Sequence, residues 1–180
     1  MRKIDTIVVH CSATQAKQDI DAAWIDRLHR SQGWRMCGYH YVIKRDGAIE
    51  SQATGQKCRP VDQAGAHVGN AFNAPGQPGW NSRSIGICMA GGINEKGKAE
   101  NNFTESQFKS LEELVLTLIE NHSEIKYLGG HRDVISVSSR FGKTPAKDCP
   151  CFEVKTWFDT VQAKAVYSQR VLDIIDIKAM

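Results

Sequence analysis

The sequence predicts an α/β fold: a single domain with a central mixed β-sheet flanked by helices. Two observations support this prediction. Short apolar runs of strand length alternate with segments of helical periodicity, which is typical of helices packed on a largely parallel sheet. An Asp-Gly pair also joins two strand-like runs, so one strand pair should be antiparallel and the sheet mixed. A length of 180 residues fits one domain with a sizeable core.

The expected strands are apolar runs, rich in β-branched or aromatic residues and bounded by turn residues. They span residues 4–9, 39–44, 48–52, 84–89 and 125–128. Asp46 and Gly47 form the turn of the hairpin, because this dipeptide readily adopts the positive φ values of a tight turn. The last of these strands is expected to deliver His131 just beyond its end.

Two helices are marked by their end signals as well as by their apolar faces. Asp21 is a suitable N-cap for the first helix, which should stop at Gly33. Thr104 and Gln107 form a capping box for the second helix. Apolar residues of the second helix recur with helical spacing as far as Ile119, which predicts one buried face.

No internal repeat, low-complexity tract or linker divides the chain. Residues 152–180 have a helical pattern with a break near Tyr167. We therefore predict a main, catalytic domain over residues 1–158. A C-terminal helical extension over residues 159–180 would pack on this domain or project from it.

Composition and charge exclude several classes of function. Hydrophobic and charged contents of 41% and 24% are ordinary for a soluble globular protein. A net charge of +3 suits an anionic polymer such as a bacterial cell wall but is too weak to indicate nucleic-acid binding. We expect no membrane insertion, because no apolar run is long enough to cross a bilayer. The first residues lack the apolar core of a signal peptide, so we expect synthesis in the cytoplasm.

The six cysteines are expected to be free thiols. Disulfide frameworks are typical of short secreted chains, whereas this chain is long and has apolar segments to pack. Cys149 and Cys151 are only two residues apart, a spacing that does not suit two ligands of one zinc ion. At most one of these two cysteines should therefore bind metal.

The stretch from Gly130 to Phe152 brings together His131, Lys147 and Cys149. Imidazole nitrogen and thiolate sulfur are good ligands for Zn²⁺. A catalytic zinc has three protein ligands and leaves the fourth position to water or substrate. The third ligand must come from elsewhere in the chain. His10 is the best candidate, because it ends the first predicted strand, where a rigid scaffold can hold a ligand.

Six motifs, in the same order along the chain, resemble one family. They are Val9-His10-Cys11-Ser12-Ala13-Thr14, Gly38-Tyr39-His40-Tyr41-Val42-Ile43, Gly65-Ala66-His67, Asn81 to Ile87, Gly130-His131-Arg132-Asp133 and Lys147-Asp148-Cys149-Pro150. From about Ile4 to Trp157 the chain resembles the zinc-dependent N-acetylmuramoyl-L-alanine amidases of the phage-lysozyme and peptidoglycan-recognition type. The segment from Cys149 to Phe152 is most similar to phage endolysins.

The resemblance implies roles for particular residues. One zinc ion would be held by His10, His131 and Cys149. Tyr39 and Lys147 would be catalytic: the lysine would present a cation to the developing oxyanion, and the phenol would orient the attacking water.

The peptidoglycan groove would contain His67 and Asn81 by the same resemblance. Trp80 lies in a Gly/Pro-rich loop and is the tryptophan that we expect to meet a sugar ring. Compared with the shorter family pattern, residues 136–144 form an insertion between the last two zinc ligands, which we expect to be a loop.

The implied reaction is zinc-dependent hydrolysis of the amide between N-acetylmuramic acid and L-alanine in bacterial peptidoglycan. We expect a monomer that acts in host lysis and reaches the periplasmic wall after a membrane pore opens. Three alternatives remain at this stage. They are a non-catalytic peptidoglycan-binding module of the same fold, a cysteine hydrolase with Cys11 or Cys149 as nucleophile, and a purely structural zinc site.

Overall fold

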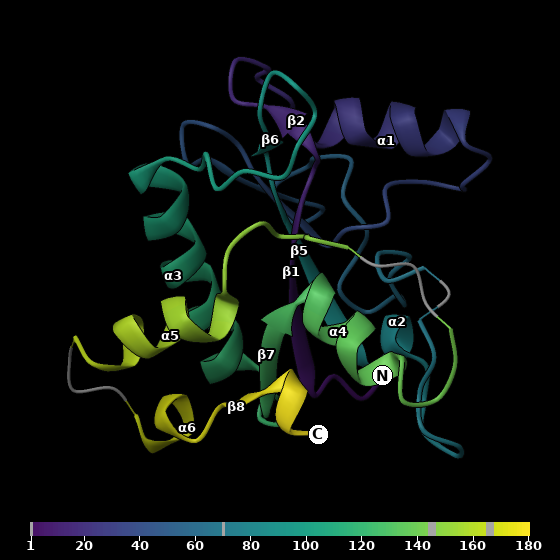
Figure 1. Cartoon of the computed structure of the whole chain (residues 1–180), viewed down its shortest axis with the longest axis vertical. Helices are drawn as coiled ribbons and strands as arrows, with labels where there is room; N and C mark the ends of the chain where they lie inside the picture. Colours follow the sequence, from purple (N-terminus) through teal and green to yellow (C-terminus); the bar gives the residue numbers. More distant parts are fainter. Residues whose placement is uncertain (1, 70, 144–146, 165–167) are drawn as a thin grey trace.

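The computed structural model describes residues 2–69, 71–143, 147–164 and 168–180 (Figure 1). Within these residues the elements, in chain order, are β1 (Thr6–Cys11), β2 (Thr14–Gln15), α1 (Ala22–Ser31), β3 (Tyr41–Ile43), β4 (Ile49–Ser51), α2 (Trp80–Arg83), β5 (Ser84–Met89), β6 (Gly92–Ile93), α3 (Glu105–Asn121), β7 (Tyr127–Gly130), α4 (His131–Ser138), α5 (Val154–Gln162), α6 (Gln169–Leu172), β8 (Ile175–Asp176) and a 3₁₀ turn (Ile177–Ala179).

The central sheet of the described chain has the strand order β4-β3-β5-β1-β7-β8. Strand β1 lies between β5 and β7 and is parallel to both, whereas β3 and β4 pair in the antiparallel direction. A separate pair, β2 and β6, is also parallel. This arrangement confirms the predicted single-domain α/β fold with a mixed sheet.

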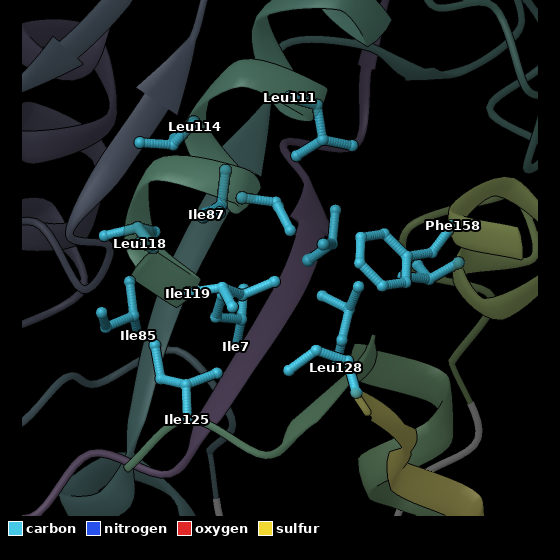
Figure 2. Close-up of a cluster of buried hydrophobic side chains, with 14 of the residues drawn as sticks. Ile7, Ile85, Ile87, Leu111, Leu114, Leu118, Ile119, Ile125, Leu128 and Phe158 are labelled. Carbon is cyan, nitrogen blue, oxygen red and sulfur yellow. The ribbon is translucent and has the colours of Figure 1, made fainter. Parts of the chain in front are cut away.

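The two faces of the sheet carry different layers. Alternate residues of β1, Ile7 and Val9, join the largest buried cluster, together with apolar residues of β5, α3 and α5. Figure 2 shows this cluster between the sheet and α3, with Phe158 of α5 closing one side. Val8 points to the opposite face and packs in a second cluster with Val134 of α4. His10 is two residues after Val8 in the same strand, so its side chain points to the same face of the sheet as that of Val8.

Several local predictions are confirmed in detail. Strand β5 spans the predicted residues, and the hairpin turns at Gly47, which has a φ of 90°. Asp21 caps α1 by accepting a hydrogen bond from the Trp24 amide. The capping box at the start of α3 is formed as expected. These features depend on local sequence chemistry, which is why the sequence predicts them well.

Four predicted strands have different bounds in the structure: β1 begins at Thr6 and continues to Cys11, β4 is shorter by one residue at each end, and β3 and β7 start later than predicted. Strand β7 begins at Tyr127, because the buried apolar Ile125 packs into the core before the strand pairing starts. Strand β3 begins at Tyr41, so Tyr39 and His40 lie just before it. The predicted loop over residues 136–144 also needs correction, because α4 continues to Ser138; residue 144 lies outside the described residues.

The C-terminal part of the chain is not purely helical. The predicted boundary at residue 158 falls inside α5, and β8 joins the central sheet by pairing with β7 (Figure 1). Val161, Val171 and Ile174 belong to the same buried cluster as the sheet. These residues therefore pack on the main domain. The predicted break near residue 167 lies outside the described residues.

Among the described residues, no helix has the length and apolar character needed to cross a membrane.

Candidate metal centre

Two histidines meet where adjacent parallel strands end. His10 is the penultimate residue of β1 and is fully buried. His131 is the first residue of α4 and directly follows β7, whose Gly130 pairs with Val9 of β1. Because the two strands run in parallel, their carboxyl ends lie side by side. The rings of the two histidines have centroids 4.7 Å apart.

Backbone hydrogen bonds bring Cys149 to the same place. The amide of Arg132, next to His131, donates to the carbonyl of Cys149 at 2.8 Å. The amide of Cys11, next to His10, donates to the Cys149 Sγ at 3.2 Å. Each imidazole is therefore followed in the chain by a residue whose amide holds Cys149, and the sulfur lies 3.7 Å from His10 Nδ1.

The three side chains form a group that could hold a metal ion. Single ligand atoms of His10, His131 and Cys149 all lie within 4.8 Å of one another. This is the set of ligands that the sequence predicts, and the structure brings all three together. All six cysteines of the chain are free, as expected.

The protein environment favours the neutral form of both imidazoles. Burial, followed by the neighbouring charge of His131, holds the pKa of His10 well below its ordinary value of 6.5. Burial and the nearby charge of Lys147 lower the pKa of His131 to about 4. Neutral imidazole keeps a lone pair for a metal, so both side chains are prepared to act as ligands at neutral pH.

A cavity of about 650 Å³ opens over this group of ligands. His131, Cys149, Tyr39 and Lys147 all border it. The ring of Tyr39 lies 5.2 Å from that of His10, measured between centroids. The predicted catalytic pair therefore lines the same cavity as two of the ligands.

The phenol of Tyr39 is a proton donor in this setting rather than a base. Burial is the main cause that raises its pKa well above the ordinary value of 10, with nearby thiols adding to the effect. The phenol stays protonated at neutral pH, so it can donate a hydrogen bond. Lys147 is exposed and presents a cation at the cavity.

The predicted sugar contact of Trp80 is wrong, because this side chain is 1% exposed. It packs with Val8 and Val134, and its indole N–H donates to the Phe72 carbonyl at 2.9 Å. The Gly/Pro-rich composition of the loop favours a rim position, but the tryptophan turns inward.

His67 and Asn81 have internal partners. His67 borders the cavity but is only 5% exposed, and its Nδ1 lies 2.9 Å from His10 Nε2. Asn81 Oδ1 accepts hydrogen bonds from the amides of His67 and Val68. A substrate contact by either residue stays a prediction.

The sequence predicts no substrate contact for two aromatic residues that lie at the cavity. Trp34 and Phe72 line it and are 37% and 45% exposed. Phe72 lies in the same Gly/Pro-rich stretch as Trp80, and an aromatic residue in such a stretch is the only signal that the sequence offers for it. Exposed rings beside a cavity are suited to stacking on a ligand.

Solved structures of peptidoglycan amidases and recognition proteins share this fold. One is the N-acetylmuramoyl-L-alanine amidase LysC from Clostridium intestinale, with 27% identity, a TM-score of 0.63, and coverage of 91% of this chain and 85% of that chain. A mutant of Drosophila PGRP-LB in complex with tracheal cytotoxin has 17% identity, a TM-score of 0.58, and coverage of 93% and 85%, which shows the fold alone. The fold and the site thus define a protein of the type-2 amidase and peptidoglycan-recognition class.

Sequence comparison narrows this class to one family. The family model described as N-acetylmuramoyl-L-alanine amidase matches residues 1–152. An endolysin of Escherichia phage T7 is 37% identical over 155 residues, which cover 86% of this chain and 85% of that protein. The chain therefore belongs to the N-acetylmuramoyl-L-alanine amidase family, and it is an amide hydrolase that acts on peptidoglycan.

Proposed function

We propose that this protein is a zinc-dependent endolysin that cleaves the amide between N-acetylmuramic acid and L-alanine, with one zinc ion held by His10, His131 and Cys149. The observation that carries the proposal is the convergence of two neutral imidazoles and one thiol at the cavity. A tetrahedral zinc would separate its nitrogen and sulfur ligands by about 3.5 Å. The distance of 3.7 Å between His10 Nδ1 and Cys149 Sγ fits that value.

Bound zinc would polarise the scissile carbonyl and lower the pKa of a coordinated water to about 7. Tyr39 would donate a hydrogen bond that orients the reacting oxygen, because its phenol keeps its proton. Lys147 would place its ammonium beside the oxyanion that develops on the carbonyl oxygen. Both residues border the cavity together with His131 and Cys149, which supports these roles.

The substrate partner is a muropeptide of peptidoglycan. Trp34 and Phe72 offer exposed rings at the cavity that could stack on a sugar or cover the stem peptide. We propose these two residues as glycan contacts in place of Trp80. All of the proposed ligands and catalytic residues come from one chain, which supports action as a monomer.

The proposed place of action is the periplasmic peptidoglycan, after release from the cytoplasm of an infected bacterium. The endolysin of phage T7 supports this part of the proposal, since its identity with this chain extends over most of both proteins.

The test is mass spectrometry of the products released from purified peptidoglycan, with and without a zinc chelator. We expect free stem peptides that begin with L-alanine. They should disappear on chelation and return when zinc is added. Intact glycan-peptide fragments would contradict the amide cleavage, and unchanged release in chelator would contradict the role of zinc. Binding to peptidoglycan without any release would instead indicate a recognition module.

A further inference from the structure

A chain of polar contacts runs away from the candidate metal centre behind His10. His10 Nε2 lies 2.9 Å from His67 Nδ1. The other nitrogen of His67, Nε2, lies 3.3 Å from the Ser84 hydroxyl. That hydroxyl donates to the carbonyl of Trp80 at 2.6 Å. The chain is buried along its length and starts at the ring nitrogen of His10 that faces away from Cys149.

The positions of the hydrogen atoms follow from this network. The single hydrogen of the Ser84 hydroxyl is used on Trp80, so Ser84 can only accept from His67 Nε2–H. A neutral His67 then has a lone pair on Nδ1, which must accept from His10 Nε2–H. The remaining lone pair of neutral His10 is on Nδ1, the atom that faces Cys149 Sγ.

The backbone that carries His67 is held by Asn81. The Asn81 Oδ1 accepts hydrogen bonds from the amide of His67 at 2.9 Å and from that of Val68 at 3.2 Å. Asn81 therefore fixes the segment whose imidazole contacts His10.

The fold also makes room for the His67 ring. A Cβ at Gly65 would lie 2.3 Å from His67 Cδ2, and a Cβ at Gly86 would lie 2.6 Å from His67 Cγ. A side chain at either position would displace the imidazole, since real contacts are longer. Gly86 and Ser84 are two residues apart in β5 and therefore face the same side of the sheet. Gly86 leaves space for the His67 ring, and Ser84 accepts its hydrogen bond.

We propose that His67 and Asn81 are positioning residues, which hold the imidazole of His10 in the orientation and tautomer that zinc binding needs. This inference rests on the proposed zinc site. Partners of this kind usually change metal affinity about 10- to 100-fold when they are removed. A role in substrate binding would leave zinc affinity unchanged, so the two roles can be separated by measurement.

The experiment is competition for zinc with a chromophoric chelator, using the whole protein and a matched pair of variants. In His67→Asn the carboxamide oxygen can take the place of Nδ1 and accept from His10. In His67→Gln the longer chain moves the carboxamide towards the place of Nε2, so this acceptor is lost. We expect zinc affinity close to wild type for H67N and about 10- to 100-fold weaker for H67Q.

A second pair of variants tests the role of Asn81 and leaves the side chain of His67 unchanged. Asn81→Leu removes the acceptor for both amides, whereas Asn81→Asp keeps an oxygen there. We expect weaker zinc binding for N81L and nearly normal binding for N81D. The absorption spectrum of the cobalt-substituted protein should change in H67Q and N81L, because the ligand geometry is altered.

Wild-type zinc affinity in both H67Q and N81L would overturn the inference. If KM for muropeptide rises in H67Q while zinc affinity stays normal, the residue contacts substrate instead. Failure of wild-type protein to bind zinc would overturn the proposed function itself, which is a different result. Should H67Q not fold, the N81L and N81D pair decides the question independently.

Discussion

Three sulfur atoms lie close to the candidate metal centre, and their surroundings differ. Cys149 Sγ faces His10 Nδ1 and accepts a hydrogen bond from the Cys11 amide. Cys151 Sγ instead donates to the carbonyl of Gly92 at 3.0 Å. Cys11 Sγ lies 3.7 Å from Cys151 Sγ, and a hydrogen bond with Cys149 is the largest cause that raises the Cys11 pKa to about 12. Of these three thiols, Cys149 is the one arranged to bind metal.

We therefore expect opposite results from two serine substitutions. Cys149→Ser should weaken zinc binding by more than about 100-fold and abolish amidase activity, because it removes a direct ligand. Cys151→Ser should keep zinc and activity within a few-fold of wild type, since a hydroxyl can still donate to Gly92. Zinc content of the purified variants, measured by mass spectrometry, checks this. Loss of zinc in C151S alone would contradict the assignment.

The β3–β4 hairpin and the start of α3 are packed together through the turn. Gly47 has a φ of 90°, and its carbonyl accepts a hydrogen bond from Ser110 Oγ at 2.6 Å. A Cβ at Gly47 would lie 2.9 Å from the carbonyl oxygen of Ser106. The turn thus needs glycine for two separate reasons, its backbone conformation and the close approach of the helix.

Gly47→Ala should therefore destabilise the protein more than Gly55→Ala. Gly55 has a φ of 80°, but a methyl group there would have no neighbouring atom within 4 Å, so its substitution costs only the left-handed conformation, about 1–2 kcal/mol. The additional contacts at Gly47 should cost about 1–3 kcal/mol more. Urea unfolding followed by circular dichroism measures both. Equal losses would show that α3 adapts to the methyl group.

Much of this architecture is predictable from the sequence, and the reasons are local. The capping box of α3 and the turn at Gly47 depend on residues a few positions apart. Strand β8 escapes prediction because its two residues give no periodic pattern, and only its pairing with β7 defines it. The burial of Trp80 and the contact between His10 and His67, 57 residues apart, depend on tertiary packing. The three candidate ligands, His10, His131 and Cys149, are predictable because imidazole and thiolate are good ligands for zinc and because the motifs around them resemble a zinc amidase family.

Buried neutral histidines make the stability of the whole protein sensitive to acid. His40 is fully buried, and burial lowers its pKa to about 3. Its Nδ1 accepts from the Gly86 amide at 2.9 Å, so its Nε2–H donates to the Gln63 carbonyl at 3.1 Å. Protonation of Nδ1 would place a second N–H against the N–H of Gly86 and remove this hydrogen bond. The native state therefore disfavours the protonated form of His40.

The free energy of unfolding should therefore fall as the pH drops below about 6.5, the ordinary histidine pKa. Between that pH and 3 the unfolded state binds more protons than the native state, so His40 alone should contribute a slope of about 1.4 kcal/mol per pH unit. His40→Asn keeps an acceptor for Gly86 and should have a shallower slope. Urea titrations from pH 7 to 4, in chelator to exclude effects of zinc, compare the two proteins. Identical slopes would rule out His40 as a source.

The central place of β1 has a consequence for the timing of synthesis. This strand carries His10 and is made early, but its two neighbours are formed by residues 84–89 and 127–130. Pairing between such distant segments forms slowly and late. A growing chain on the ribosome therefore holds one of the candidate ligands long before the other two exist. We expect the candidate metal centre to form only after Cys149 has been synthesised, when the sheet brings His131 and Cys149 to His10.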